Sequence, residues 1–396
     1  MAAGSFQTMK STNKVAVLEQ IFIGEPVSRA QIAKVTKLTP PTVSSMVKEL
    51  IDDGLVIETT TGESIGGRKP ILLSLNPYKF FSIGVHIAPN YFKLTQANLR
   101  GVILAEETHE LFAGMNKDAF TELLLEKTEM FMQQFDCKDL LGIGIAAHGI
   151  IDNKQGNVIF SPYYQLHDVA LQQEFEARFD VPSYLENDSR VMTWAEFWSG
   201  AGRYCDSFAT IKVDQGIGGG LVINRQLIHG NSSVAGEFGH MTLDIHGEPC
   251  RCGNRGCLET LAGFRAVFKR INERLTASGL EPLPKYDYAR LQAEYEAGNE
   301  IVHDEFDKLA TYLSIGIVNI LHAIGSDLIV IGGQISRFEP MLLPLIRERV
   351  AARAITLEER AVPIVFSQLG DDVVSIGANI LVLRHILEPD YMNHSD

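Results

Sequence analysis

The sequence predicts an N-terminal winged helix-turn-helix domain over residues 1–76, followed by a larger α/β body made of two lobes. Apolar residues recur at helical spacing in three short segments before residue 54, and two strand-like segments follow them. From about residue 80, short apolar segments typical of strands alternate with longer helical ones, which is the pattern of layered α/β domains. Together these observations separate a small helical domain from a large α/β body.

Composition and charge narrow the class of protein. The chain has 396 residues, 45% of them hydrophobic, and we find no apolar run of about 18 residues that could span a membrane. It also shows no basic-then-apolar signal peptide, so we expect a cytoplasmic protein without membrane insertion. The net charge is −14, but residues 1–76 hold eight Lys/Arg and seven Asp/Glu, so the acidic charge lies in the body. A near-neutral first domain can bind DNA if its cations share one face.

Two helices are predicted before residue 37. Val15, Leu18 and Phe22 share one helical stripe, and Gly and Pro in the segment 24–26 end that helix. Ser28 and Gln31 have the spacing of a capping box, which predicts the start of a second, short helix.

The third helix has the features of a DNA-reading helix. Thr39 suits the N-cap and Pro40 the first helical position. The apolar stripe then follows the 3.6-residue period closely, at Val43, Met46, Val47, Leu50 and Ile51. The opposite face is small and polar at its N-terminal end, as a helix in the major groove requires. We expect Thr42, Ser44 and Ser45 to read bases and Lys48 to contact phosphate.

The segment after this helix predicts a β wing. Residues 55–58 and Ile71–Leu75 are strand-like, and the turn-rich tip between them contains Gly66, Gly67, Arg68 and Lys69. Such a slim basic tip can place Arg68 in a minor groove. We therefore expect double-stranded operator DNA as a partner, bound by a homodimer because helix-turn-helix proteins usually pair across two half-sites. The alternative is a small helical domain that binds protein or only dimerises.

The body is predicted to contain two series of strands and helices. A helix is expected over residues 118–135 in the first series and over 303–323 in the second, with a closing helix over 374–387. A glycine-rich turn at Gly216–Gly220 is expected in the second series, between the strands 208–213 and 219–223. The other predicted strands are 80–88, 92–98, 102–106, 141–147, 183–186, 328–331 and 363–367.

Four residues form a metal-binding pattern. His240, Cys250, Cys252 and Cys257 give the spacing His-x9-Cys-x-Cys-x4-Cys. Three thiolates and one imidazole fill a tetrahedral Zn²⁺ shell and leave no open position for catalysis, so we expect a structural zinc. The alternative is a set of reduced cysteines in an ordinary loop.

The same segment carries a family resemblance. Gly236–His240 and the run Cys250–Thr260 resemble the ROK family (repressors, open reading frames, kinases), and the repressor branch resembles this chain along its whole length. The resemblance implies an actin/hexokinase-like body. Its first lobe would span 77–187, joined by the C-terminal helix at about 374–396. Its second lobe would span 188–373, with the zinc loop 240–257 and dimerisation helices.

The resemblance also implies a sugar site. In ROK sugar kinases the residues that match Asn187, Asp188, Glu237, His240 and Glu259 hold the sugar, and the Asp is the general base on the attacked hydroxyl. Carboxylates and amides suit a pyranose, whose hydroxyls both donate and accept. The alternative is that these residues are remnants that hold the hinge through hydrogen bonds. The family usually has Pro-Gly where this chain has His148-Gly149, which leaves the identity of the sugar open.

The loop after the first body strand argues against an enzyme. ROK kinases carry Asp-x-Gly-Gly-Thr there, whereas this chain has His86 for the Asp and Ala88 and Pro89 for the glycines. Phosphoryl transfer depends on a cradle of N–H groups and metal, and proline has no N–H. Glycines remain at Gly216–Gly220 and at Gly332-Gly333, although glycines also serve tight turns.

The sequence thus predicts a repressor of carbohydrate-metabolism genes, controlled by a sugar or sugar phosphate bound to a catalytically inactive body. It would act as a homodimer or tetramer. One alternative is a ROK regulator controlled by a protein partner, such as a phosphotransferase-system subunit. A second alternative is an active ATP-dependent sugar kinase that carries a DNA-binding domain.

Overall fold

The computed structural model describes residues 12–61, 70–230, 234–355 and 361–387. The chain divides into two compact units. Unit 1 comprises Met1–Val191 and Val374–Asp396, and unit 2 comprises Met192–Val373. The expected domain boundaries at residues 76 and 187 stay predictions.

The N-terminal part of unit 1 is a winged helix-turn-helix. Its helices are α2 (Thr12–Gly24), α3 (Arg29–Thr36) and α4 (Pro40–Asp52), and its strands are β1 (Val27–Ser28), β2 (Val56–Thr61) and β3 (Ile71–Leu75), in the order β1-β3-β2. Both predicted caps are present, since the Ser28 side chain accepts the Gln31 N–H and the Thr39 side chain accepts the Thr42 N–H. Only β1, two residues long, was not predicted.

The rest of unit 1 is built on a five-stranded sheet in the order β11-β7-β4-β5-β6. Strands β11, β7 and β4 run parallel, and the hairpin partners β5 and β6 run antiparallel. Ile87 pairs with Ala147, and Ala147 with Asn187, so the three parallel strands end level. The bounds are β4 (Phe81–Ile87), β5 (Tyr91–Asn98), β6 (Ile103–Glu110), β7 (Leu140–Ala147) and β11 (Ser183–Asn187).

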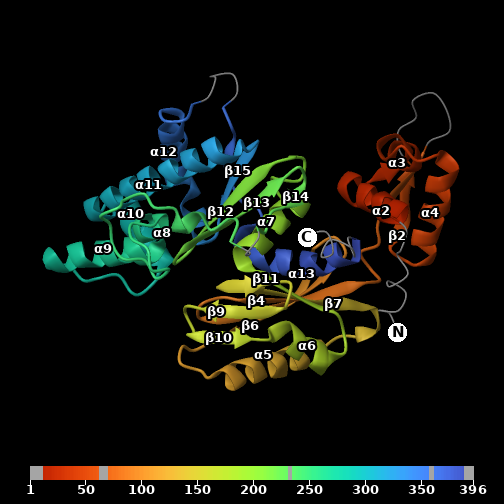
Figure 1. The fold of residues 1–396 in the computed structure, drawn as a ribbon, viewed down its shortest axis with the longest axis horizontal. Coiled ribbons are helices and arrows are strands. Elements are labelled where there is room, and N and C mark those ends of the chain that lie inside the picture. The colour runs from red at the N-terminus through yellow and green to blue at the C-terminus, as the bar shows by residue number, and fades with distance from the viewer. Residues whose placement is uncertain (1–11, 62–69, 231–233, 356–360, 388–396) are drawn as a thin grey trace. The chain divides into compact units, whose positions relative to one another are not determined.

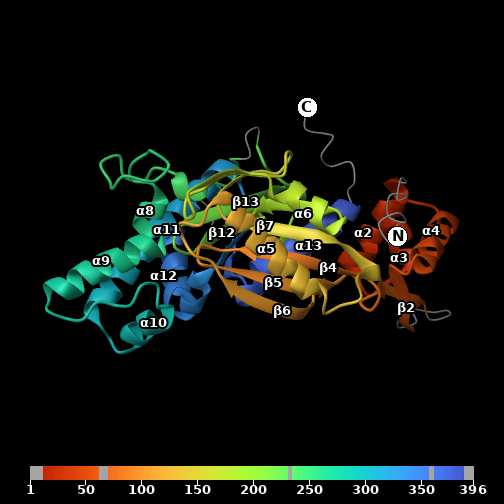
Figure 2. The same ribbon diagram turned by 90° about the horizontal axis from the view of Figure 1, so that it is seen from below.

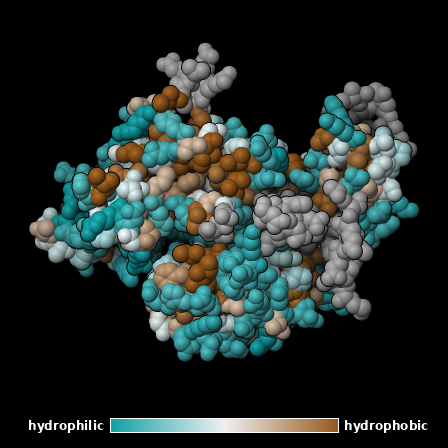
Figure 3. Space-filling view, in the orientation of Figure 1, coloured by the Kyte–Doolittle hydropathy of each residue, from teal (hydrophilic) through white to brown (hydrophobic). Residues whose placement is uncertain are grey.

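Helices cover both faces of this sheet (Figures 1 and 2). α5 (Lys117–Met132) and α6 (Leu171–Phe179) lie on one face, and α13 (Val373–Leu387) lies on the other. α13 approaches closely because Gly144 has no side chain: a Cβ there would lie 1.8 Å from the Ala378 carbonyl oxygen. Figure 3 shows mostly polar residues around α5 and α6, as expected for amphipathic helices with one face on the sheet.

A second, three-stranded antiparallel sheet follows β7 in unit 1. It consists of β8 (Ile150–Asp152), β9 (Asn157–Ser161) and β10 (Leu166–Val169), in the order β10-β9-β8. A short 3-10 helix, η1 (Cys137–Asp139), precedes β7.

Unit 2 repeats the strand order of unit 1. Its sheet is β14-β13-β12-β15-β16, again an antiparallel hairpin beside parallel strands. The strands are β12 (Phe208–Val213), β13 (Ile217–Ile223), β14 (Gln226–Leu227), β15 (Leu328–Gly332) and β16 (Ile364–Phe366). The helices are α7 (Asp188–Ser199, which begins in unit 1), η2 (Phe238–His240), α8 (Leu258–Ala262), α9 (Phe264–Ala277), α10 (Tyr288–Glu296), α11 (Glu300–Ile324), η3 (Gln334–Phe338), α12 (Glu339–Ala351) and η5 (Gly370–Asp372).

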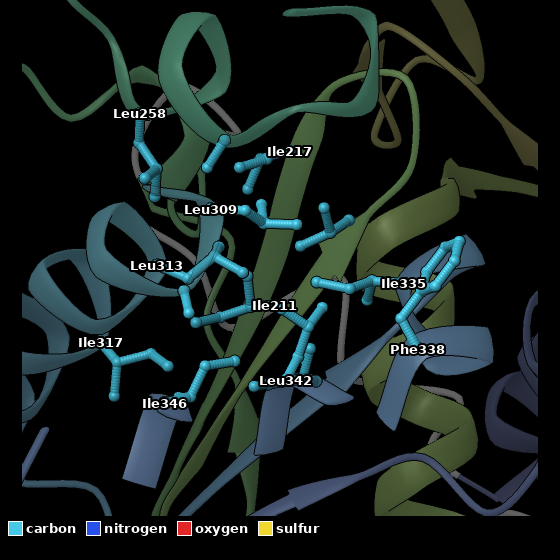
Figure 4. Close-up of a cluster of buried hydrophobic side chains, with 14 of the residues drawn as sticks. Ile211, Ile217, Leu258, Leu309, Leu313, Ile317, Ile335, Phe338, Leu342 and Ile346 are labelled. Atoms are coloured by element: carbon cyan, nitrogen blue, oxygen red, sulfur yellow. The ribbon is translucent and has the colours of Figure 1, made fainter. Parts of the chain in front are cut away.

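The core of unit 2 lies between its sheet and the long helix α11. Figure 4 shows Ile211 of β12 and Ile217 of β13 facing side chains of α11 and α12, namely Leu309, Leu313, Ile317, Leu342 and Ile346. Each of these is at most 5% exposed, and burying such a side chain contributes about 1.5–3 kcal/mol. This core supports the segment that carries the metal-binding pattern, because Leu258, at the start of α8, belongs to it.

The predicted glycine-rich turn at Gly216–Gly220 is wrong in extent. Only Gly216 lies in the turn, and Gly218, Gly219 and Gly220 lie inside β13. A Cβ on Gly220 would lie 2.0 Å from the Thr193 hydroxyl oxygen, and one on Gly219 would lie 2.5 Å from the Phe238 ring. These glycines therefore permit close packing on both faces of a strand.

No helix within the described ranges is both long and apolar enough to cross a membrane.

Candidate functional sites

The predicted metal ligands converge in unit 2. One ligand atom from each of His240, Cys250, Cys252 and Cys257 lies within 4.8 Å of the others. The Sγ atoms of Cys252 and Cys257 are 3.7 Å apart, and Cys250 Sγ is 3.5 Å from His240 Nδ1. η2 supplies the histidine, and Cys257 is the N-cap of α8, so two elements of the fold hold the ends of the cluster.

These distances fit zinc. Two sulfur ligands at about 2.3 Å from a tetrahedral ion lie about 3.8 Å apart, and a sulfur and a nitrogen ligand lie about 3.6 Å apart. Burial raises the pKa values of the Cys250 and Cys257 thiols, whereas at Cys252 burial is outweighed by hydrogen bonds, which lower its pKa. A bound cation would hold all three as thiolates at neutral pH. A metal ion can therefore bind here, while its identity as zinc is a proposal.

Two glycines with positive φ, Gly253 and Gly256, allow the loop to turn tightly around the cluster. Gly256 has φ +60°, and a Cβ there would lie 1.6 Å from the Asp244 carbonyl oxygen. Gly253 has φ +91° with open space around it. Any other residue at position 256 would push the segment that carries Cys257 away from the segment that follows His240.

Three of the predicted sugar residues also lie together in unit 2. His240 Nδ1 faces the metal cluster and lies 3.8 Å from Glu259 Oε1, while His240 Nε2 lies 3.9 Å from Glu237 Oε2. The side chains of Glu237 and His240 are 38% and 35% exposed, and that of Glu259 is 20% exposed. The imidazole can thus bind a metal through Nδ1 while Nε2 points toward Glu237. The carboxylates of Glu237 and Glu259 then lie on either side of the ring.

The other two predicted sugar residues adjoin each other in unit 1, at the junction of β11 and α7. Asn187 caps α7: its Oδ1 accepts the N–H groups of Ser189 (2.9 Å) and Arg190 (3.3 Å), and its Nδ2 donates to the Gly149 carbonyl (2.9 Å). Asp188 is buried, and its Oδ1 accepts the Ser189 hydroxyl at 3.2 Å. Much of the hydrogen-bonding capacity of Asn187 is used within the fold.

The turn after β4 is a tight hairpin. The Ala88 N–H donates to the Tyr91 carbonyl at 2.9 Å, and the Tyr164 hydroxyl donates to the Ala88 carbonyl. The two residues at the tip are Pro89, which has no N–H, and Asn90. His86, where ROK kinases have their Asp, is 5% exposed within β4. The turn therefore offers no open nest of N–H groups to a phosphate.

The predicted DNA-reading residues lie on α4, with the exception of Arg68. Ser44, Ser45 and Lys48 are exposed, and Thr42 is half-buried with its hydroxyl 2.8 Å from that of Thr39. We find no ion pair for Lys48 within the parts of the chain that the structure describes. Arg68 lies outside the described residues.

Sequence reasoning missed the roles of His148, Glu186 and Arg190. Glu186 and Arg190 form a buried ion pair, 2.7 Å from Arg190 Nε to Glu186 Oε1, and the Asn187 N–H donates to the same carboxylate oxygen. His148 Nδ1 lies 3.8 Å from Asp188 Oδ2. The four-residue spacing of Glu186 and Arg190 at a helix start was a usable signal, and so was the departure from Pro-Gly at His148.

Comparison with known proteins decides the family, because the model of the ROK family matches residues 82–385. This chain belongs to the ROK family. A winged helix-turn-helix DNA-binding model also matches residues 24–57. The predicted fold class, a winged helix-turn-helix followed by a ROK body, is confirmed.

Relatives of this ROK protein include regulators and kinases. The xylose repressor of Bacillus spizizenii is 30% identical, over 96% of this chain and 97% of its own length. The crystal structure of a ROK family transcriptional regulator, a homologue of the E. coli MLC protein, has a TM-score of 0.80 at 25% identity and covers 95% of this chain and 98% of its own. A ROK family glucokinase from Streptomyces griseus, in complex with glucose and AMPPNP, has a TM-score of 0.68 at 25% identity and covers 77% of this chain and 99% of its own.

Proposed function

We propose that this ROK protein is a DNA-binding transcriptional repressor of carbohydrate-metabolism genes, and that its body binds a sugar without transferring phosphate to it. The winged helix-turn-helix and the full-length similarity to a xylose repressor support the first part. Because a repressor of this kind binds chromosomal DNA, we expect the protein in the cytoplasm.

The hairpin at Ala88–Tyr91 carries the proposal that the body is not a kinase. Phosphoryl transfer is mainly positioning and charge stabilisation, so it needs N–H donors and a metal-binding carboxylate around the phosphates. Here the Ala88 N–H is already bonded to Tyr91, Pro89 has none to offer, and His86 replaces the acid. The turn after β4 therefore lacks both the N–H donors for the phosphates and the carboxylate for their metal ion.

A turnover assay tests this proposal. The purified protein is incubated with Mg-ATP and either D-xylose or D-glucose, and ADP release is followed, with a ROK glucokinase run in parallel. We expect no sugar-dependent ADP release. Turnover of about 1 per second or faster, within the usual range of enzymes, would show a working kinase.

We propose that zinc is bound by His240, Cys250, Cys252 and Cys257 and is structural. When bound, the ion would cross-link η2 to the start of α8. Glu259 lies two residues after Cys257, so the loop would hold this carboxylate where a ligand can reach it.

We propose that the sugar-binding residues are Asn187 and Asp188 in unit 1 and Glu237, His240 and Glu259 in unit 2. D-xylose is the first candidate effector, because a relative that is 30% identical to this chain is named a xylose repressor. For a sugar to control DNA binding, its affinity must differ between the DNA-bound and free states, since coupling between two sites is reciprocal.

We propose that the protein binds DNA as a homodimer, with Thr42, Ser44 and Ser45 reading bases and Arg68 in a minor groove. Lys48 would contact phosphate. Lys48→Ala should then weaken binding to specific and unrelated duplexes alike and lower the slope of log K against log salt by about 1. Fluorescence anisotropy at several salt concentrations measures both.

Lys285→Ala, in the body, is the control for Lys48→Ala and should change neither quantity. An unchanged salt slope for the Lys48 variant would remove Lys48 from the DNA interface.

A further inference from the structure

A third residue lies beside the candidate sugar ligands of unit 1. Strands β4, β7 and β11 are parallel neighbours that end level, so the residues that follow them, Ala88, His148 and Asp188, lie along one edge of the sheet. Ligands of open α/β sheets bind outside the carboxyl ends of the strands. His148 thus lies between the closed hairpin at Ala88 and the buried carboxylate of Asp188.

The backbone fixes the direction of the His148 side chain. Its N–H donates to the Ile87 carbonyl at 3.3 Å, and the next carbonyl, that of Gly149, accepts from Asn187 Nδ2 at 2.9 Å. Gly149 has φ +124°, and a Cβ there would lie 2.4 Å from the Phe160 carbonyl oxygen. The chain can therefore turn here only at glycine, and in this turn the His148 ring places Nδ1 3.8 Å from Asp188 Oδ2.

The side chains of His148 and Asp188 differ in their exposure to a ligand. The Asp188 side chain is 3% exposed, whereas that of His148 is 34% exposed. Within unit 1, a ligand that reaches this edge therefore meets the imidazole before it meets the buried carboxylate. At 3.8 Å the contact between Nδ1 and Oδ2 is longer than a hydrogen bond, and the negative charge of Asp188 on this side of the ring favours the tautomer with the proton on Nδ1. The lone pair of Nε2 is then available to a ligand.

We propose that His148 is a further effector-contacting residue of unit 1, beside Asn187 and Asp188, that Asp188 also positions it, and that the effector is a neutral sugar rather than a sugar phosphate. This rests on the sugar-binding function proposed above. With a neutral ring the His148–Asp188 pair carries one negative charge, and with a protonated ring it carries none. In neither state does the pair attract a phosphate, whereas Nε2 accepts a hydrogen bond from a hydroxyl of a neutral sugar.

Calorimetric titration with D-xylose, D-glucose and D-glucose 6-phosphate tests the contact. For the sugar that binds best, His148→Ala should raise Kd about tenfold, as expected for the loss of one hydrogen bond within a site. His148→Gln, which keeps a polar side chain, should recover part of the affinity. His167→Ala, at an exposed histidine elsewhere in unit 1, is the matched control and should leave Kd unchanged.

A spectroscopic measurement tests the positioning role of Asp188. In protein labelled with ¹⁵N-histidine, the His148 signals, assigned by their loss in His148→Ala, should show the proton on Nδ1. Asp188→Asn should shift this tautomer balance, because an amide can also donate to Nδ1. A wild-type proton on Nε2, or a balance that Asp188→Asn leaves unchanged, overturns the positioning role.

The outcomes are distinguishable. If the wild-type protein binds a neutral sugar and His148→Ala binds it within twofold, only the inference about His148 fails. Tighter binding of D-glucose 6-phosphate than of either neutral sugar overturns the proposed ligand class. Failure of the wild-type protein to bind any of the three sugars counts against both this inference and the sugar-responsive function.

Discussion

Cys257→Ser is expected to lose the bound metal and to destabilise unit 2 strongly. Cys257 is fully buried, caps α8 and lies 3.7 Å from Cys252 Sγ, so a serine would remove a ligand from the centre of the cluster. Structural zinc in small domains binds with an apparent free energy of about 10–16 kcal/mol at neutral pH, and that binding stabilises the fold directly. Elemental analysis and differential scanning calorimetry measure the metal content and the melting temperature.

The control for this variant is Cys137→Ser, since Cys137 is exposed and outside the cluster. That variant should keep about one metal ion per chain and the native melting temperature. A wild-type protein without bound zinc after metal-free purification, or a Cys257→Ser variant that keeps its zinc, would refute the structural metal site.

Glu259→Gln is expected to raise the Kd for the effector by about 10- to 100-fold, because a hydrogen bond to a charged group contributes about 1.5–3 kcal/mol. The substitution keeps the shape of the side chain and removes its charge. Glu259 Oε1 lies 3.0 Å from Cys250 Sγ, but Glu259 is not among the four predicted ligands and glutamine keeps an oxygen at this place, so the zinc content should not change. Calorimetric titration of the sugar, together with elemental analysis, separates a lost sugar contact from a lost metal.

Glu248→Gln provides a matched control in the same loop. Glu248 is exposed and lies 3.6 Å from Lys269, an ion pair of little expected energy. Equal sugar affinities of the Glu259 and Glu248 variants would show that Glu259 does not bind the effector.

The sequence predicted well the elements that are specified by local signals. Thr39 with Pro40, and Ser28 with Gln31, mark helix starts through contacts within a few residues, and both starts are found. The metal cluster was predictable for a similar reason, since the residue types and their spacing already describe a tetrahedral shell.

Features that depend on tertiary packing were not predictable in this way. Gly219 and Gly220 serve the approach of Phe238 and Thr193 to a strand, and a single sequence cannot distinguish that use from a turn. The small sheet β8–β10 was missed because its pairs, such as Phe160 with His167, come from a register that spacing does not reveal.

The roles of the side chains at the edge of the unit 1 sheet were also not predictable from the sequence. The sequence places Asn187 and Asp188 at a strand end, but it does not show that the Asn187 amide caps α7 or that Asp188 is almost fully buried. The pairing of β11 with β7 also brings Gly149 and His148 within reach of the start of α7, which spacing along the chain does not reveal.

The most direct test of the account is the DNA affinity of the purified protein with and without sugar. Anisotropy is measured on labelled duplexes from the DNA upstream of its own gene and of the flanking genes, with and without saturating D-xylose or D-glucose. The account predicts tight, sequence-specific binding that one neutral sugar weakens, and, by reciprocity, weaker binding of that sugar to the DNA-bound protein. Specific DNA binding that is identical with and without a sugar that demonstrably binds would contradict it.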